Sequence, residues 1–209
     1  MWRKRCRRVA AWALATAAAL LTVLLVRALS LRSRQPAAEP LRDPPVDAAK
    51  LAADLGAAIT TRTVSESAEA LAPAAELAAL REHLARAFPK VHGALARETV
   101  GEHGLLYTWR AEGSLSPVIL CAHQDVVPVE PGTEERWSAP PFAGMVDERF
   151  VWGRGTLDDK GSLVAILTAV EALLEEGFRP ARTVHLAFGH DEEVSGRAGA
   201  GRIVDVLAS

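Results

Sequence analysis

Two short apolar runs, each followed by polar residues, constrain the fold of this chain most strongly. Residues 118–122 read Val-Ile-Leu-Cys-Ala and residues 183–188 read Thr-Val-His-Leu-Ala-Phe. Both have the length and the apolar continuity of strands that are buried on two faces. Residues 162–176, between them, repeat apolar side chains with helical spacing, and Gly177 is placed to end that helix. Strands that alternate with helices predict an α/β fold, with helices packed on the faces of a sheet.

The rest of the chain adds further elements to this expected sheet. Asp47 is placed to cap a helix, and a turn that contains Gly101 and Gly104 separates two strand-like segments. The additional helices and strands are expected at residues 47–59, 73–88, 91–100, 105–110 and 197–208. We therefore predict a mixed sheet flanked by helices over residues 48–209.

The N-terminal segment contains an uncharged run of 18 residues, 9–26, preceded by five basic residues. This length is at the lower limit for crossing a bilayer, which takes about 20 apolar residues. A cleaved signal peptide has a shorter apolar core and a small-residue cleavage site, whereas basic residues follow this run. We expect residues 1–34 to form an uncleaved transmembrane signal anchor, with cleavage and secretion as the alternative. The positive-inside rule then predicts that residues 48–209 lie outside the cell or in a lumen, although the basic residues beyond the apolar run weaken this prediction.

Two compositional features separate the anchor from the body. Four prolines between residues 35 and 47 indicate a stiff linker that would hold residues 48–209 away from the bilayer. The first 34 residues carry eight basic side chains and no acidic one, which leaves 16 basic against 26 acidic residues in the remainder. An acidic body argues against binding to nucleic acid, whose phosphates require a basic surface.

Imidazole and carboxylate side chains follow both predicted strands and the turn between them. Ligand-binding residues of open α/β sheets gather beyond the carboxyl ends of the strands, so we expect these side chains to meet at one edge. Imidazole and carboxylate ligands suit zinc, and adjacent carboxylates can divide metal binding from proton transfer. The residues in question are His123, Asp125, Asp158, Glu192 and Glu193. The sequence thus predicts a hydrolytic metal site.

Each of these motifs, taken alone, can be explained without a metal site. A histidine after a strand is more often structural than a ligand, and an acidic run such as residues 191–193 is usually a solvated loop. The glycine-rich turn around Asp158 lacks the spacing of a nucleotide-binding loop, so phosphate binding is excluded. Cys121 is expected to be a small buried side chain of a strand rather than a catalytic thiol. The ordered combination of the motifs therefore carries the metal hypothesis.

In that combination, the chain resembles the di-zinc amidohydrolase family that includes carboxypeptidase S, aminoacylase and the glutamate carboxypeptidases. The motif residues are most similar to those of the branch that contains carboxypeptidase S and the N-fatty-acyl-amino-acid synthase/hydrolase. The resemblance extends over roughly residues 47–209. The motifs that carry the resemblance are His123-Gln-Asp125, Trp137-Ser-Ala-Pro-Pro-Phe142, Gly153-Arg-Gly-Thr-Leu-Asp158-Asp159-Lys-Gly161 and Gly189-His-Asp-Glu192-Glu193-Val-Ser-Gly196. The resemblance implies a zinc-exopeptidase-like catalytic domain that cleaves a peptide or an N-acyl amino acid.

The resemblance also implies a role for each site residue. His123 would bind one zinc ion, Asp158 would bridge two, and Glu193 would bind the other. Asp125 would orient His123, and Glu192 would be the general base that takes a proton from the attacking water and passes it to the leaving amine. The family further has a cis peptide bond directly after its bridging aspartate, here between Asp158 and Asp159.

Members of the family have further metal ligands and a further domain that this chain does not contain. A further acidic ligand, a lid and dimerisation domain and a final histidine ligand come later in the family, so we expect residues 48–209 to be the N-terminal portion of a C-terminally truncated catalytic domain. A homodimer would then form only where that further domain is present. The alternative from another functional class is a catalytically inactive, truncated isoform that acts as a membrane-tethered binding or decoy module.

Overall fold

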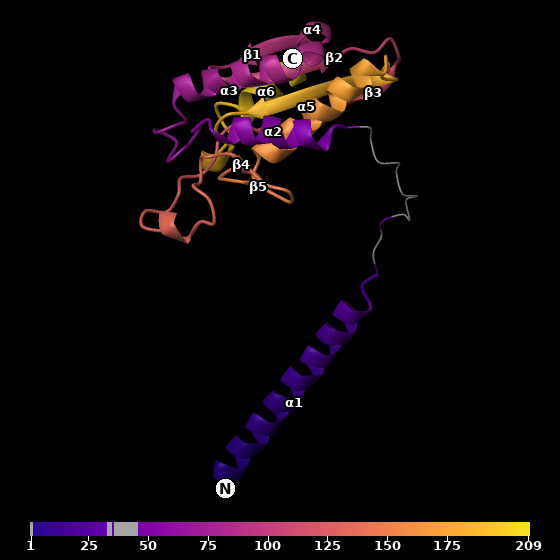
Figure 1. Cartoon of the computed structure of the whole chain (residues 1–209). Helices are drawn as coiled ribbons and strands as arrows, with labels where there is room; N and C mark the ends of the chain where they lie inside the picture. Colours follow the sequence, from indigo (N-terminus) through magenta and orange to yellow (C-terminus); the bar gives the residue numbers. More distant parts are fainter. Residues whose placement is uncertain (1, 33–34, 36–45) are drawn as a thin grey trace. The chain divides into compact units, whose positions relative to one another are not determined.

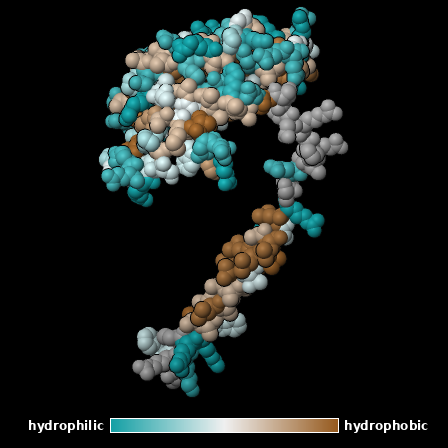
Figure 2. All heavy atoms as spheres, in the orientation of Figure 1, coloured by the Kyte–Doolittle hydropathy of each residue, from teal (hydrophilic) through white to brown (hydrophobic). Residues whose placement is uncertain are grey.

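The computed structural model describes residues 2–32, 35 and 46–209, and the chain divides into two compact units, residues 1–43 and 44–209 (Figure 1). The first unit contains helix α1 (Trp2–Leu29), whose described apolar side chains are exposed along its length (Figure 2). Residues 7–29 of α1 are long and apolar enough to cross a membrane, judged by length and composition alone. The predicted apolar helix is thus present, whereas most of the expected linker lies outside the described residues.

The second unit is built around a four-stranded sheet with the strand order β1-β2-β6-β3. A separate two-stranded hairpin, β4–β5, lies beside α2. In chain order the elements are α2 (Ala48–Ile59), α3 (Ala74–Ala87), α4 (Pro89–Ala94), β1 (Ala96–Val100), β2 (Gly104–Trp109), β3 (Leu115–His123), β4 (Met145–Val146), β5 (Val151–Trp152), α5 (Lys160–Glu175), β6 (Arg182–Gly189) and α6 (Ala200–Ala208). The architecture is the mixed sheet with flanking helices that the sequence predicts.

The pairing of the strands decides where their polar ends lie. β1 with β2 and β2 with β6 are antiparallel, whereas β3 and β6 are parallel. His123, the last residue of β3, is paired with Gly189, the last residue of β6. The residues that follow the two strands therefore leave the sheet side by side, at the same edge.

Helices cover the two faces of the sheet unequally. The larger core lies between the sheet and the helices α2 to α5, where Leu163 and Leu167 of α5 pack with Leu186 and Phe188 of β6. On the opposite face, Ile203 of α6 packs against a smaller set of residues, Val100, Leu106 and Ala187. The two central strands, β2 and β6, thus alternate their side chains between two cores of different size, as the pleat requires.

Local signals explain most of the helix boundaries. The side chain of Asp47 accepts hydrogen bonds from the backbone N–H groups of Ala49 and Lys50, so it caps α2 as expected. Gly177 follows α5 with a φ of 71°, a left-handed conformation that favours glycine. Both signals could be read from the sequence because capping depends on residues that are neighbours in the chain.

The strand predicted at residues 91–100 is wrong in its first half, because residues 91–94 belong to helix α4. Pro89 stands at the first turn of α4, and the carboxylate of Glu171 accepts hydrogen bonds from the backbone N–H groups of Lys90 (3.0 Å) and Val91 (2.8 Å). These are donors that the start of a helix leaves without a partner. A carboxylate from α5, about 80 residues further along the chain, thus decides the local structure here.

The prediction that residues 118–122 are buried on both faces is also wrong. The exposed fractions are 49% for Ile119 and 41% for Leu120, and the side chain of Cys121 is exposed as well. Among the described residues, β3 pairs only with β6, and it packs against α5 on one face. As an edge strand with little packing around it, β3 leaves consecutive side chains in solvent, although the apolar sequence is typical of a buried strand.

Candidate metal site

Three separate segments bring their polar side chains together at the shared end of β3 and β6. His123 comes from the end of β3, Asp158 from the glycine-rich turn before α5, and Glu193 from the 3₁₀ turn that follows β6. One ligand atom from each of these three residues lies within 4.8 Å of the other two. The structure thereby places the three metal ligands that the resemblance implies around one point.

His123 is almost completely buried, and both of its ring nitrogens have hydrogen-bond partners. Its Nε2 atom lies 2.9 Å from Oδ1 of Asp158 and 3.7 Å from Oε2 of Glu192. Its Nδ1 atom faces Asp125, at 3.0 Å from the backbone carbonyl oxygen and 3.4 Å from Oδ1. Burial alone would lower the pKa of His123, but hydrogen bonds to the carboxylates of Asp125 and Asp158 raise it to about 9.

Asp125 is fully buried and connects His123 with the turn after β6. Its Oδ1 accepts a hydrogen bond from the backbone N–H of Glu192 (3.1 Å), and its Oδ2 accepts one from that of Glu193 (3.3 Å). Burial raises the pKa of Asp125, but hydrogen bonds from His123 and Ser65 outweigh it, and the net shift is downward. The carboxylate is therefore placed to orient both a ring and a backbone turn, which is compatible with the orienting role that the resemblance implies.

The three remaining carboxylates lie at the surface of the site. The exposed fractions of the side chains are 77% for Asp158 and 58% for Glu192, and Glu193 is partly buried. Burial and the nearby carboxylate of Asp158 raise the pKa of Glu193. The peptide bond between Asp158 and Asp159 is cis, as the resemblance implies. A group of like charges at one end of a cleft is an arrangement that a divalent cation would relieve.

The glycine-rich turn passes so close to other segments that side chains would not fit. Gly155 has a φ of 87°, and a Cβ atom there would lie 2.5 Å from Cγ1 of Val126. The absence of side chains lets the turn approach the segment that follows β3, and so brings Asp158 toward His123. The glycines thus have a steric role in the site, which is separate from the phosphate binding that the spacing excludes.

Lys160 is a supporting residue that the sequence did not single out. It is fully buried at the start of α5, and its Nζ donates hydrogen bonds to the carbonyl oxygens of Ala58 (3.0 Å) and Thr61 (2.7 Å) and to Oγ1 of Thr61 (3.0 Å). Burial lowers the pKa of Lys160 to about 7. Lys160 joins the start of α5 to the end of α2, and Asp158 stands two residues before this anchor.

Gln124 and His190 stand inside the motifs that carry the resemblance, but the sequence predicts no role for either of them. The Nε2 atom of Gln124 donates to the carbonyl oxygens of His103 (2.9 Å) and Phe188 (3.0 Å), so it ties the end of β3 to the end of β6. His190 is fully buried, and its ring packs edge-on against that of His103 at a centroid distance of 5.4 Å. Both residues hold the strand ends that carry the site.

The donor set fits a divalent ion of the zinc type. One imidazole nitrogen and two carboxylates within 4.8 Å of one another are ligands that zinc accepts, and manganese or cobalt binds similar sets. The second ring nitrogen of His123 already has an oxygen acceptor at 3.0 Å, which is the usual support for a metal-bound histidine. The geometry therefore fits the predicted metal, and the predicted general base Glu192 lies beside the same point.

Comparisons with known proteins agree with this arrangement. Residues 119–209 match the family model described as peptidase family M20/M25/M40. The chain is 40% identical over 190 residues to a probable carboxypeptidase S-like protein of Dictyostelium discoideum, and covers 36% of it with 87% of its own length. It is 44% identical over 156 residues to the N-fatty-acyl-amino acid synthase/hydrolase of Mus musculus, and covers 30% of it with 73% of its own length. The chain thus spans about a third of the length of these curated relatives.

The fold also matches that of solved structures. A metallo-carboxypeptidase of Sulfolobus solfataricus shares the fold with a TM-score of 0.54 at 23% identity. The match covers 68% of this chain and 31% of that one. At this identity the likeness establishes the fold alone.

Proposed function

Because residues 119–209 match the model of peptidase family M20/M25/M40, we propose that this protein is a membrane-anchored, zinc-dependent hydrolase of amide bonds. The substrate would be a peptide or an N-acyl amino acid, since the similar proteins are named as a carboxypeptidase and as an N-fatty-acyl-amino acid hydrolase. The observation that carries the proposal is the meeting of His123, Asp158 and Glu193 within 4.8 Å, from three segments that are far apart in the chain.

The metal ligands follow from the positions of these side chains. His123 would hold one zinc ion through Nε2, because Nδ1 is turned toward Asp125. Glu193 would hold a second ion, and Asp158 would be shared by both, as the family resemblance implies. Zinc, when bound, supplies a Lewis acid that lowers the pKa of water and polarises an amide carbonyl.

We assign the proton transfers of the reaction to Glu192. Its carboxylate is more than half exposed and stands 3.7 Å from Nε2 of His123, so it faces the space where substrate and water would enter. Its backbone N–H is fixed by the carboxylate of Asp125. Glu192 would take a proton from the attacking water and pass it to the leaving amine, which separates proton transfer from metal binding.

A hydrolysis assay with one carboxylate variant tests the proposal. The full-length protein, including any residues that follow Ser209, is supplied with Zn²⁺ and assayed on a panel of dipeptides and N-acyl amino acids. We expect hydrolysis of at least one substrate, and loss of that hydrolysis on chelation. Glu192→Gln should lower kcat by at least about 100-fold while zinc remains bound, since general-base catalysis contributes about 10²–10⁴-fold.

Glu98→Gln is the matched control, because Glu98 is exposed on β1 and should leave kcat unchanged. Zinc bound without hydrolysis of any substrate would contradict the enzymatic proposal. Absence of both zinc and hydrolysis would favour the inactive, membrane-tethered binding module instead. Metal analysis of the purified chain also distinguishes zinc from manganese and cobalt.

The anchor is a separate part of the proposal, supported by the exposed apolar helix α1. We expect the chain to stay in the membrane pellet after an alkaline carbonate wash, with residues 48–209 protected from protease in sealed vesicles. Replacing Leu20 and Leu24 with arginine should release the chain from the pellet. A soluble product that lacks the N-terminal residues would show that the segment is a cleaved signal peptide.

A further inference from the structure

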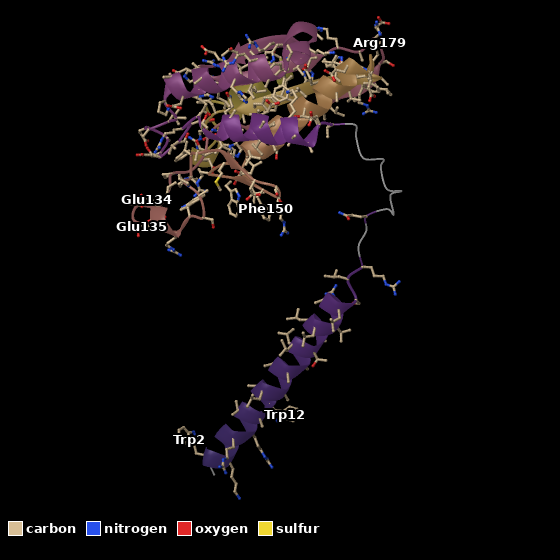
Figure 3. The ribbon with its side chains drawn as sticks, viewed as in Figure 1. Trp2, Trp12, Glu134, Glu135, Phe150 and Arg179 are labelled. Atoms are coloured by element: carbon tan, nitrogen blue, oxygen red, sulfur yellow. The ribbon has the colours of Figure 1, made fainter. Side chains whose placement is uncertain are left out.

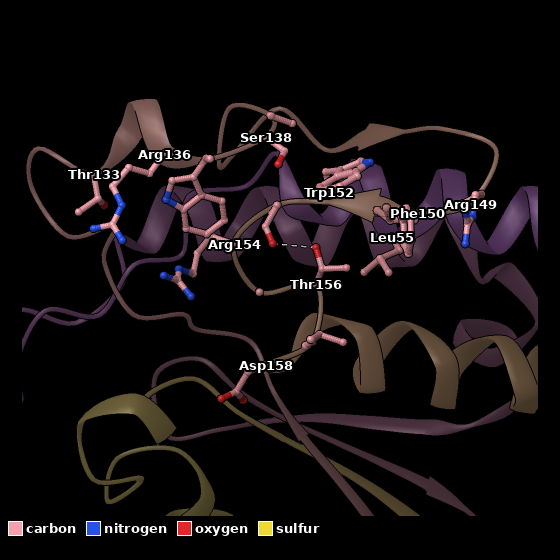
Figure 4. Close-up of a pocket in the computed structure, with 16 residues that line it drawn as sticks. Leu55, Thr133, Arg136, Ser138, Arg149, Phe150, Trp152, Arg154, Thr156 and Asp158 are labelled. Carbon is pink, nitrogen blue, oxygen red and sulfur yellow. Dashed lines mark hydrogen bonds between the residues drawn. The ribbon is translucent and has the colours of Figure 1, made fainter.

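A cavity of about 1150 Å³ opens on one side of Asp158 (Figure 4). Its walls are the turn and second strand of the β4–β5 hairpin (residues 149–152), the loop over residues 133–139 and the glycine-rich turn over residues 153–158, and Leu55 of α2 lines it as well. Asp158 is shared between this cavity, here called the aromatic cleft, and the candidate metal site. Whatever occupies the cleft would therefore lie next to the reacting groups.

Aromatic rings supply much of the apolar surface of the cleft. Phe150 and Trp152 pack against each other with ring centroids 5.3 Å apart, and Phe150 is 52% exposed. Figure 4 shows them grouped with Leu55 toward one end. The indole N–H of Trp152 donates to Oδ2 of Asp147 (2.6 Å), which fixes the ring. Fixed and partly exposed rings offer a preformed surface to an apolar group.

Three arginines, Arg136, Arg149 and Arg154, line the same cleft. Within the described part of the chain, none of the three has a carboxylate within ion-pair distance. The guanidinium of Arg154 lies over the ring of Trp137 at 5.1 Å, and its Nε atom is buried without a hydrogen-bond partner. The guanidinium of Arg154 thus lines the cleft without a carboxylate beside it among the described residues, and an anionic ligand would supply one.

We propose that the aromatic cleft binds the part of the substrate that joins a large apolar group to a carboxylate, with Arg154 as the carboxylate partner. The inference rests on the proposed function and narrows its substrate to amphipathic anions. The apolar group would lie on the rings of Phe150 and Trp152, and the guanidinium of Arg154 would receive the carboxylate. A short, fully polar dipeptide would leave the rings exposed and would bind weakly.

Binding of a fluorescent amphipathic anion tests this directly. The full chain is placed in lipid nanodiscs, so that α1 is accommodated, and titrated with N-dansyl-phenylalanine in the presence of chelator. We expect saturable binding that Arg154→Gln weakens at least about tenfold, the lower end of what a charged hydrogen bond contributes. N-dansyl-phenylalaninamide, which lacks the carboxylate, should bind the unaltered chain as weakly as the acid binds the variant.

Arg179→Gln is the matched control, because Arg179 is exposed at the turn between α5 and β6, on the opposite side of the domain from Phe150 (Figure 3). It should leave the affinity within twofold, and it carries the same nanodisc background. Phe150→Ser tests the rings without Arg154, and since Phe150 is half exposed the domain should still fold. This variant should weaken both probes several-fold.

Two outcomes would overturn the inference. Equal affinity for the acid and the amide would show that no carboxylate is recognised, and equal affinity in Arg154→Gln and Arg179→Gln would show that Arg154 is not its partner. Because chelator is present throughout, binding is measured without metal or turnover. If the chain binds the probe but hydrolyses no amide, only the proposed function is contradicted. If it hydrolyses an amide but does not bind the probe, only the proposed binding in the aromatic cleft is contradicted.

Discussion

Asp125 shows how a residue outside the metal-ligand set can control it. Its carboxylate contacts His123 on one side and the backbone of Glu192 and Glu193 on the other, so two segments that carry ligands depend on one buried group. The sequence predicted only the first of these contacts, because Asp125 stands two residues from His123. The second contact joins residues that are 67 and 68 positions apart. Only the pairing of β3 with β6 brings them together.

We predict that Asp125→Asn weakens zinc binding about 10- to 100-fold, the range found when a group that supports a metal ligand is altered. The amide keeps the size of the side chain but loses the charge and one acceptor, so His123 and the turn after β6 become less well held. Zinc affinity is measured by competition with a chromophoric chelator.

Asp205→Asn is the control for this measurement, because Asp205 is exposed on α6 and, among the described residues, forms an ion pair only with Arg202, at 3.9 Å. It should leave zinc affinity unchanged. An unchanged affinity in Asp125→Asn would remove Asp125 from the support of the site.

At the scale of elements, the contrast between α2 and α4 shows which helices a sequence can reveal. The cap of α2 is Asp47, the residue directly before the helix, so its signal lies in the local sequence. The start of α4 is satisfied by Glu171, whose carboxylate comes from α5. Residues 91–94 were therefore expected to be extended, because the group that makes them helical is distant in the chain.

We predict that Glu171→Ala lowers the free energy of unfolding by about 1–2 kcal/mol, as the loss of a capping side chain usually does. Two backbone N–H groups at the start of α4 would lose their acceptor in a nearly buried position. Urea denaturation followed by circular dichroism measures the change.

Glu175→Ala is the matched control on the same helix. Glu175 is 57% exposed and makes a surface ion pair with Lys90 at 3.5 Å, so its removal should cost less than about 1 kcal/mol. If both variants lost the same stability, the capping role of Glu171 would be refuted.

At the scale of the whole molecule, metal binding should be coupled to the stability of residues 44–209. The proposed ligands come from β3, the turn before α5 and the turn after β6, so an ion that joins them would resist unfolding of all three. A ligand at 100 times its dissociation constant stabilises the folded state by about 2.7 kcal/mol. Zn²⁺ should thus raise the Tm by several degrees.

Thermal unfolding with and without Zn²⁺ measures this effect, with Mg²⁺ as the control ion. Asp158→Asn should abolish most of the shift, because Asp158 is the residue proposed to hold both ions. Its side chain is 77% exposed, so the substitution itself should alter the stability of the metal-free domain little. A shift of equal size in Asp158→Asn would show that zinc stabilises the chain elsewhere.

The sequence by itself determined the class of fold, the apolar N-terminal helix, the candidate ligands and the family. These properties depend on periodicity, on capping residues and on short motifs, all of which are local in the chain. Only the tertiary structure showed that Lys160, Gln124 and Asp125 connect the segments that carry the site, that β3 is an exposed edge, and that Glu171 makes residues 91–94 helical. The physical reason is the same in each case: hydrogen-bond partners and burial are set by residues far away in the sequence, which meet only when strands pair and helices pack.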